Sequence, residues 1–345
     1  MLNEANNWCL ITTYKENYSL LAAFFSFYRN YYNIKNFVML CGAPKSRTHN
    51  SLEKLISAKT MLGVNIGPAI YFTHASRKIT VSELSSGDVR LWVASYAAED
   101  FTSELEFHSL KIELHRWVDS FLPQEIARTW VLDSDEFMRV SNPESLDDAD
   151  SLGFHFLDMI PSLAWPPNAL FFSLQGWYYR RQALLRFRIG KDLMFSFMKA
   201  IGRGINHSGC KTFYFQRARL SDLSSFHHGT IDNPACLTLN HHLDDLECCR
   251  RILNQSPCCY HMAMVSRDSF LSEKLRLFSR LQTDINKLPV HDIGRSPETA
   301  NQALAIKTFD NFIRNSIFPV IRDDFLLPYL PNNLIAGTTE SSSLT

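Results

Sequence analysis

Two aspartates separated by one residue are the strongest candidates for chemistry in this sequence. Asp133 and Asp135 follow the apolar run at residues 127–132, which is typical of a buried strand. Side chains two positions apart on an extended segment point to the same side. Paired carboxylates suit Mg2+ or Mn2+, which leave part of their coordination shell to substrate phosphates. The pattern therefore predicts a cation site that would stabilise the charge on a departing nucleoside diphosphate.

The D-x-D pattern also has a plain structural interpretation. Two aspartates at this spacing occur by chance about once in a chain of this length. Asp133 and Asp135 could simply end a strand and cap a helix near Pro143. Their position favours the functional interpretation, because ligands of open α/β sheets bind at the carboxyl ends of the strands.

The elements that must position these aspartates alternate along the first half of the chain. Short apolar runs predict strands at residues 8–13, 36–41, 64–72, 127–132 and 151–158. Apolar residues at helical spacing predict helices at 15–33, 51–62 and 104–121. This alternation predicts an α/β fold of the doubly wound type, with a mostly parallel sheet covered on both faces.

The composition changes after residue 161. Aromatic residues, prolines and arginines crowd residues 161–190, and residues 202–242 are rich in His, Gly and Ser. Helices are predicted at 243–254, 266–287 and 299–317. We expect one α/β domain over residues 6–255, a helical C-terminal extension over 256–330 and a disordered polar tail over 331–345.

Bulk composition narrows the class of protein. The 345 residues include 35 basic and 35 acidic ones, and this balance argues against a nucleic-acid partner, which usually requires a basic surplus. A polar N-terminus without an apolar leader, and the lack of any run of eighteen apolar residues, predict a cytoplasmic chain without a transmembrane segment. The eight cysteines are then expected to be reduced thiols, and buried small residues rather than a zinc site.

Three segments carry a resemblance to a known family. The segment WVLDSDEF at 130–137 resembles the D-x-D-E-F segment of family-2-like glycosyltransferases with the GT-A fold. The segment ITTYKEN at 11–17 is similar to that family's first-strand exit, and LTLNHH at 237–242 resembles its late strand ending in histidine. The resemblance covers residues 8–255 in order and spacing. It implies a GT-A-like, hexosyltransferase-like enzyme that moves a sugar from a nucleotide-sugar donor to a glycan or lipid-linked acceptor, using Mn2+ or Mg2+.

The resemblance also implies roles for individual residues near the donor. Thr13, Lys15 and Glu16 match the loop that approaches the nucleotide base and ribose. Asp133 and Asp135 match the pair that binds the metal and the nucleotide.

A late histidine and a third acidic residue complete the implied metal site. His241 matches the histidine that completes the cation shell, and His207 and His228 compete for this role. Glu136 would orient the acceptor or a metal-bound water.

The catalytic base is left open between two carboxylates. An inverting transferase needs a carboxylate to take the proton of the acceptor hydroxyl, and Asp158 and Asp192 are the candidates. Arg188 lies among four arginines at 180–188 that could hold a diphosphate or form a solvated basic face. The aromatic run at 165–179 suits sugar stacking, with core packing and a peripheral membrane contact as alternatives.

One departure from the family pattern motivates a second hypothesis. The loop at residues 41–48, CGAPKSRT, has no carboxylate to hold ribose or uracil. The alternative is a catalytically inactive GT-A-fold protein that binds glycans or serves as a scaffold. A phosphohydrolase that uses D-x-D as nucleophile and acid fits less well, because its aspartates belong on the first strand. Nucleotide-binding P-loop, dinucleotide G-x-G-x-x-G and G-x-S-x-G nucleophile motifs are lacking.

Overall fold

The computed structural model divides the chain into two compact units. One comprises residues 1–152 and 212–228, and the other residues 153–211 and 229–345. The structure describes residues 7–14, 18–41, 64–95, 104–146, 149, 151–159, 169–174, 210–214, 217, 246–262 and 321–331. The domain boundaries expected at residues 255 and 330 stay predictions.

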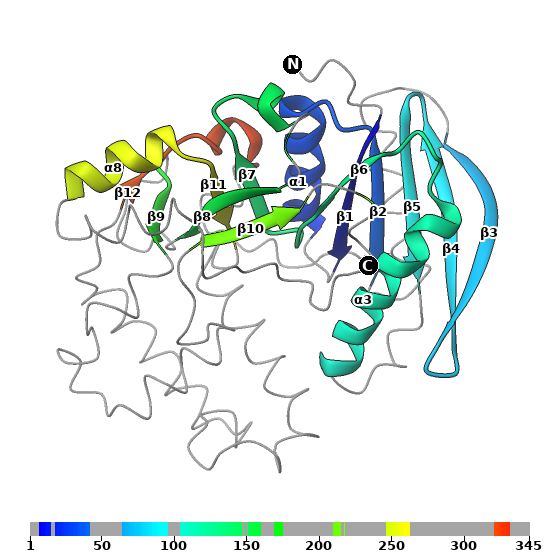
Figure 1. The fold of residues 1–345 in the computed structure, drawn as a ribbon. Coiled ribbons are helices and arrows are strands. Elements are labelled where there is room, and N and C mark those ends of the chain that lie inside the picture. Colours follow the sequence, from blue (N-terminus) through cyan, green and yellow to red (C-terminus); the bar gives the residue numbers. More distant parts are fainter. Residues whose placement is uncertain are drawn as a thin grey trace, which may run out of the picture. The chain divides into compact units, whose positions relative to one another are not determined.

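The first unit alternates strands and helices, as the sequence indicates. Its described elements are β1 (Trp8–Tyr14), α1 (Tyr18–Tyr31), β2 (Asn36–Cys41), β3 (Asn65–His74), β4 (Arg77–Ser86), β5 (Val89–Ser95), α3 (Glu104–Phe121), β6 (Arg128–Val131), β7 (Glu136–Arg139) and the 3-10 helix η3 (Pro143–Leu146) (Figure 1). The strands predicted at 8–13, 36–41 and 127–132 and the helices predicted at 15–33 and 104–121 are confirmed. The helix predicted at 51–62 lies outside the described residues.

Six strands of this unit form one mixed sheet in the order β3-β4-β5-β2-β1-β6. Strands β5, β2, β1 and β6 are parallel to one another, whereas β3, β4 and β5 form an antiparallel meander. The strand predicted at 64–72 exists as β3, but its expected parallel pairing is wrong. The two-residue turn Ala75–Ser76, with φ of 46° and 68°, reverses the chain and pairs β3 with β4 in the antiparallel sense. Strand β5, and not β3, pairs in parallel with β2.

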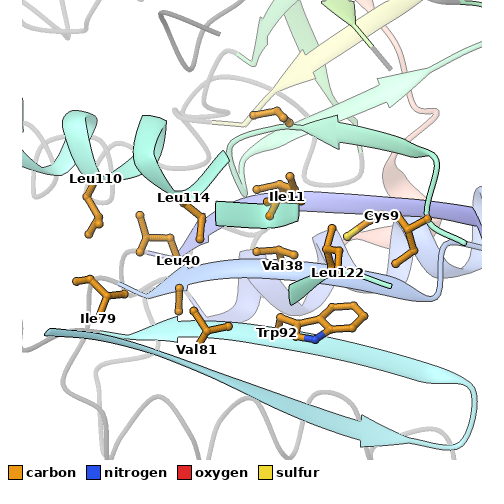
Figure 2. Packing of buried hydrophobic residues seen from close by; sticks show 14 residues of the cluster. Cys9, Ile11, Val38, Leu40, Ile79, Val81, Trp92, Leu110, Leu114 and Leu122 are labelled. Atoms are coloured by element: carbon orange, nitrogen blue, oxygen red, sulfur yellow. The ribbon is translucent and has the colours of Figure 1, made fainter. Parts of the chain in front are cut away.

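Helix α3 covers one face of this sheet. Cys9 and Ile11 from β1 and Val38 from β2 pack in a buried cluster with Leu110 and Leu114 from α3 (Figure 2). The alternate positions of β1 and β2 face the other way, because successive side chains of a strand point to opposite faces. Odd-numbered positions of β1 therefore face α3.

Helix α1 packs on the opposite face through aromatic contacts. Phe25 stacks on Phe37 of β2 with 4.4 Å between ring centroids, and Tyr28 meets the ring of Trp130 edge-on at 5.5 Å. Trp130 in turn lies 5.6 Å from Trp8 of β1. With α1 and α3 on opposite faces, the central parallel strands are buried on both sides, which explains the apolar runs of β1 and β2.

The remaining elements follow η3 along the chain. They are β8 (Ser151–Met159), β9 (Phe171–Leu174), β10 (Cys210–Tyr214), α8 (Leu246–Gln255), β11 (Cys258–His261), β12 (Ile321–Arg322) and the 3-10 helix η7 (Leu327–Tyr329). In the second unit the order β12-β9-β8-β11 forms a small sheet, in which β8 and β11 are parallel and the other pairs antiparallel.

Several C-terminal predictions meet the described residues. The strand predicted at 151–158 and the helix predicted at 243–254 are confirmed as β8 and α8. Helices expected at 266–287 and 299–317, and the tail beyond residue 331, lie outside the described part of the chain. Cys248, Cys258 and Cys259 are buried, as expected for cysteines that fill a core. Within the described ranges, no helix has the length and apolar character needed to cross a membrane.

His155, in the middle of β8, makes the second unit sensitive to acid. Burial favours the neutral ring and lowers the pKa of His155 from about 6.5 to about 4. Between these two pH values the unfolded chain binds a proton that the folded strand does not. The part of the stability that depends on His155 is therefore complete above pH 6.5 and is lost as the pH falls toward 4.

We expect this histidine to contribute about 2–3 kcal/mol of that loss, since one pKa unit corresponds to about 1.4 kcal/mol. Urea unfolding of the full chain at several pH values between 7 and 4 measures it. His155→Gln, which stays neutral, should remove this part of the pH dependence whatever it does to stability at pH 7. An identical pH dependence of stability in both proteins would show that burial does not lower the pKa of His155.

Candidate functional site

The order of the parallel strands reverses between β1 and β6. The chain runs from β1 to its neighbour β2 and then to β5 on the same side, whereas β6 pairs with the other side of β1 (Figure 1). In open α/β sheets, ligands bind outside the carboxyl ends of the strands at such a reversal. The residues that leave β1 and β6 are therefore the first place to look for a site.

Thr13 and Asp133 come together at this reversal because of the strand register. Ile11 pairs with Val131, and the N–H of Leu132 donates to the carbonyl of Ile11 at 3.0 Å, so the residues two positions further also lie opposite each other. Both side chains fall on the face that α3 covers. The Thr13 hydroxyl donates to Oδ1 of Asp133 at 3.2 Å.

A lysine that the sequence analysis did not select completes this cluster. Lys111 lies on the buried side of α3, next to Leu110, and its Nζ is 3.0 Å from Oδ1 of Asp133. The Lys111 side chain is only 3% exposed, while that of Asp133 is 22% exposed. A buried ammonium needs a counter-charge, and Asp133 supplies it. A lysine beside the apolar stripe of an amphipathic helix was the available signal, because lysine is rarely buried unless it is paired.

Glu136 fixes the turn that presents the D-x-D segment. Its carboxylate is buried and accepts the backbone N–H of Asp133 at 3.1 Å, and its own N–H donates to the Asp133 carbonyl at 3.0 Å. These two bonds close the turn, in which Ser134 and Asp135 are half-buried. One contact of this carboxylate is therefore with the turn itself. A role in orienting acceptor or water stays a prediction.

Tyrosines of α1 hold the strand that follows this turn. The hydroxyl of Tyr28 donates to the carbonyl of Glu136 and accepts the N–H of Met138, both at 2.9 Å. The hydroxyl of Tyr32 donates to the carbonyl of Met138 at 2.8 Å. Since these hydroxyls are anchored by a helix packed on the sheet, the backbone around residues 136–138 is tied to the rigid part of the unit.

The structure thus brings together only part of the predicted site. Asp133 contacts Thr13, Lys111 and Glu136, and Asp135 lies in the same turn. Asp158 lies in β8 opposite Ser173 and His261, but its side chain lies outside the description. The other predicted residues and their competitors fall outside the described ranges: Lys15, Glu16, Arg188, Asp192, His207, His228 and His241.

The described donors suit a cation that also binds a ligand. Among the residues that the structure describes, no group of three or more His, Cys, Asp or Glu side chains could hold a metal ion. The carboxylates of Asp133 and Asp135 still offer the hard oxygens that Mg2+ and Mn2+ prefer. The Lys111 ammonium shows that Asp133 already accepts a positive charge at this position. Two carboxylates alone would leave most of the coordination shell of such an ion to water or to a bound ligand.

Comparisons with protein-family models, curated proteins and solved structures find no match for this chain. The glycosyltransferase resemblance therefore stays a prediction from three sequence segments.

Proposed function

We propose that this protein is a glycosyltransferase that moves a sugar from a nucleotide-sugar donor to a glycan or lipid-linked acceptor, on a GT-A-like doubly wound fold. One observation carries the proposal: the D-x-D turn at Asp133–Asp135 follows β6, where the order of the parallel strands reverses beside β1. Residues of this kind at this topological position are suited to a phosphorylated ligand.

The described residues prepare the donor site before the ligand arrives. Asp133 and Asp135 would hold Mn2+ or Mg2+, which supplies positive charge to the departing nucleoside diphosphate. Thr13 holds one oxygen of Asp133, and Glu136 holds the turn. Groups held in this way need little rearrangement when the donor binds, and such preorganisation lowers the cost of reaching the transition state.

The rest of the proposed machinery comes from residues outside this cluster. The acceptor proton would go to Asp158 or Asp192, and Arg188 would contact the diphosphate. His241 would complete the cation shell.

Calorimetric titration of the full chain with UDP, GDP and their sugars, in the presence of Mn2+, tests the proposal. We expect one nucleotide to bind with Kd in the range of about 1 μM to 1 mM that enzymes show for their substrates. Asp135→Asn should weaken this binding by about ten-fold or more, because it removes one acidic ligand and leaves the Lys111–Asp133 pair intact.

Asp88→Asn is the matched control for this titration. Asp88 is an exposed carboxylate in the β4–β5 turn, paired with Lys35, and its loss should leave nucleotide binding unchanged. Lack of heat with every nucleotide, or equal binding by wild type and Asp135→Asn, would refute the proposed function.

A catalytically inactive glycan-binding or scaffold protein is the second candidate. The ion pair between Lys111 and Asp133 favours it, because this pair stabilises the fold without any ligand. Such a protein should bind glycans on an array equally well as wild type and as Asp135→Asn, and should not hydrolyse any nucleotide sugar.

A further inference from the structure

The ammonium of Lys111 occupies a place where a divalent cation would bind Asp133. Its Nζ lies 3.0 Å from Oδ1, and the Thr13 hydroxyl approaches the same oxygen at 3.2 Å. The Lys111 side chain is nearly inaccessible, at 3% exposure, so its charge is poorly screened by water. The pair of Lys35 with Asp88 has similar chemistry, but its side chains are 25% and 61% exposed.

We propose that Lys111 is the resident cation of the D-x-D site, and that it competes with Mn2+ or Mg2+ for Asp133. A divalent ion and an ammonium on one carboxylate repel each other, and this repulsion is strong where water is largely excluded. In the absence of nucleotide, the protein therefore binds divalent metal weakly. The metal-binding part of this inference stands on the described geometry, and the nucleotide-binding part rests on the proposed function.

A bound nucleotide changes this balance. A diphosphate brings negative charge that a metal ion and an ammonium can share, and Mg2+ and Mn2+ take phosphate oxygens as ligands readily. Metal and nucleotide then bind with positive coupling, and each raises the affinity of the other by the same factor. Lys111 thus makes the site respond to the metal–nucleotide complex instead of to free metal.

Titration with Mn2+ alone, followed by the electron paramagnetic resonance signal of the free ion, tests the competition. Lys111→Met keeps the apolar stem and removes the charge, so we expect it to bind Mn2+ about ten-fold or more tightly than wild type. The double variant Lys111→Met with Asp133→Asn should lose this gain. Lys35→Met, which removes the lysine of the exposed pair, should bind Mn2+ as wild type does.

Two further measurements keep the inference testable if Lys111→Met does not fold. Wild type that binds Mn2+ alone with Kd below about 10 μM would overturn the inference, since this approaches the affinity of dedicated metal sites. Lys111→Arg keeps the positive charge, and we expect it to bind free Mn2+ as weakly as wild type.

Adding UDP or GDP to the same titrations separates the two proposals. Nucleotide binding by wild type, with no gain of Mn2+ affinity in folded Lys111→Met, overturns the competition and leaves the proposed function standing. A gain of Mn2+ affinity in Lys111→Met, with no nucleotide bound to either protein, supports the competition and refutes the proposed function. A gain of metal affinity together with tighter Mn2+ binding in the presence of nucleotide supports both.

Discussion

Replacing Arg217 by alanine is expected to lower the free energy of unfolding by about 3–5 kcal/mol. The guanidinium satisfies carbonyls at the end of α3, where backbone acceptors have no partner within the helix. It donates to the carbonyls of Leu122 at 3.2 Å, Pro123 at 2.7 Å and Ile126 at 3.0 Å. Its Nε also donates to Asp119 at 2.7 Å. Hydrogen bonds from charged donors contribute about 1.5–3 kcal/mol each, and they are not additive.

The position of these carbonyls makes the effect large. They lie in the connection between α3 and β6. Lys111 lies on the helix before this connection, and the D-x-D turn follows the strand after it. Arg217→Lys should recover only part of the loss, because an ammonium lacks the planar fork that reaches several acceptors at once.

Arg116 provides the control. It lies on α3 and is exposed, and among the contacts described it pairs with Glu113 one turn away. Arg116→Ala should change the free energy of unfolding by about 1 kcal/mol or less. Urea unfolding of the full chain, followed by circular dichroism, measures both variants. An effect of Arg217→Ala no larger than that of Arg116→Ala would show that the observed bonds contribute little to stability.

Replacing Asp133 by asparagine is expected to destabilise the protein by about 3–4 kcal/mol. The change preserves the shape of the side chain but removes the carboxylate charge that pairs with the buried ammonium of Lys111. Breaking one partner of a buried ion pair costs about 3–5 kcal/mol, and the partial exposure of Asp133 lowers this value.

A double-mutant cycle separates the ion pair from other effects of the change. Lys111→Met combined with Asp133→Asn should be more stable than Asp133→Asn alone, because the buried ammonium is then removed together with the carboxylate. Asp135→Asn should cost much less than Asp133→Asn. Equal losses for the two aspartates, measured by urea unfolding, would contradict a buried Lys111–Asp133 pair.

This difference between the two aspartates affects how function should be tested. A loss of ligand binding in Asp133→Asn could follow from a damaged fold, whereas Asp135→Asn leaves the ion pair in place. Asp135 is therefore the informative position for nucleotide binding.

The central parallel strands and their helices were predictable because their patterns are strong. Strands β1 and β2 are largely apolar runs, as expected for strands buried under α1 on one face and α3 on the other. Helix α3 was predicted with its observed bounds, since its apolar stripe is regular and Pro123 follows its end.

The meander at β3-β4-β5 could not be predicted in the same way. Its first turn is Ala75–Ser76, which lacks the Asn-Gly or Asp-Gly signal of a tight hairpin, and non-glycine residues with positive φ are uncommon. Strand β4 begins Arg77-Lys78 and carries several polar residues. It therefore has no continuous apolar run of the kind that identified the central strands.

From the sequence, only the strand ends that carry the candidate site could be predicted, and not the contacts between their side chains. The D-x-D segment was identified from its position after an apolar run, and Thr13 from the family resemblance of residues 11–17. The contact of Lys111 with Asp133 depends on how α3 crosses the sheet, which no local pattern encodes. The resemblance assigned Glu136 to orienting the acceptor or a metal-bound water, and the structure describes a hydrogen bond from the N–H of Asp133 to its carboxylate. A carboxylate three residues after the first residue of a turn can accept a backbone N–H of that turn or can point to a ligand. Only the backbone geometry decides between these two arrangements.

The binding of a nucleotide at the reversal between β1 and β6 is the central claim. A crystal structure of the full chain grown with UDP or GDP and Mn2+ tests it most directly. We expect the diphosphate at the carboxyl ends of these two strands, in contact through the metal with Asp133 and Asp135, and with Lys111 moved from its position on Oδ1. A nucleotide bound elsewhere in the protein, with the 133–136 turn and the Lys111–Asp133 pair unchanged, would contradict it.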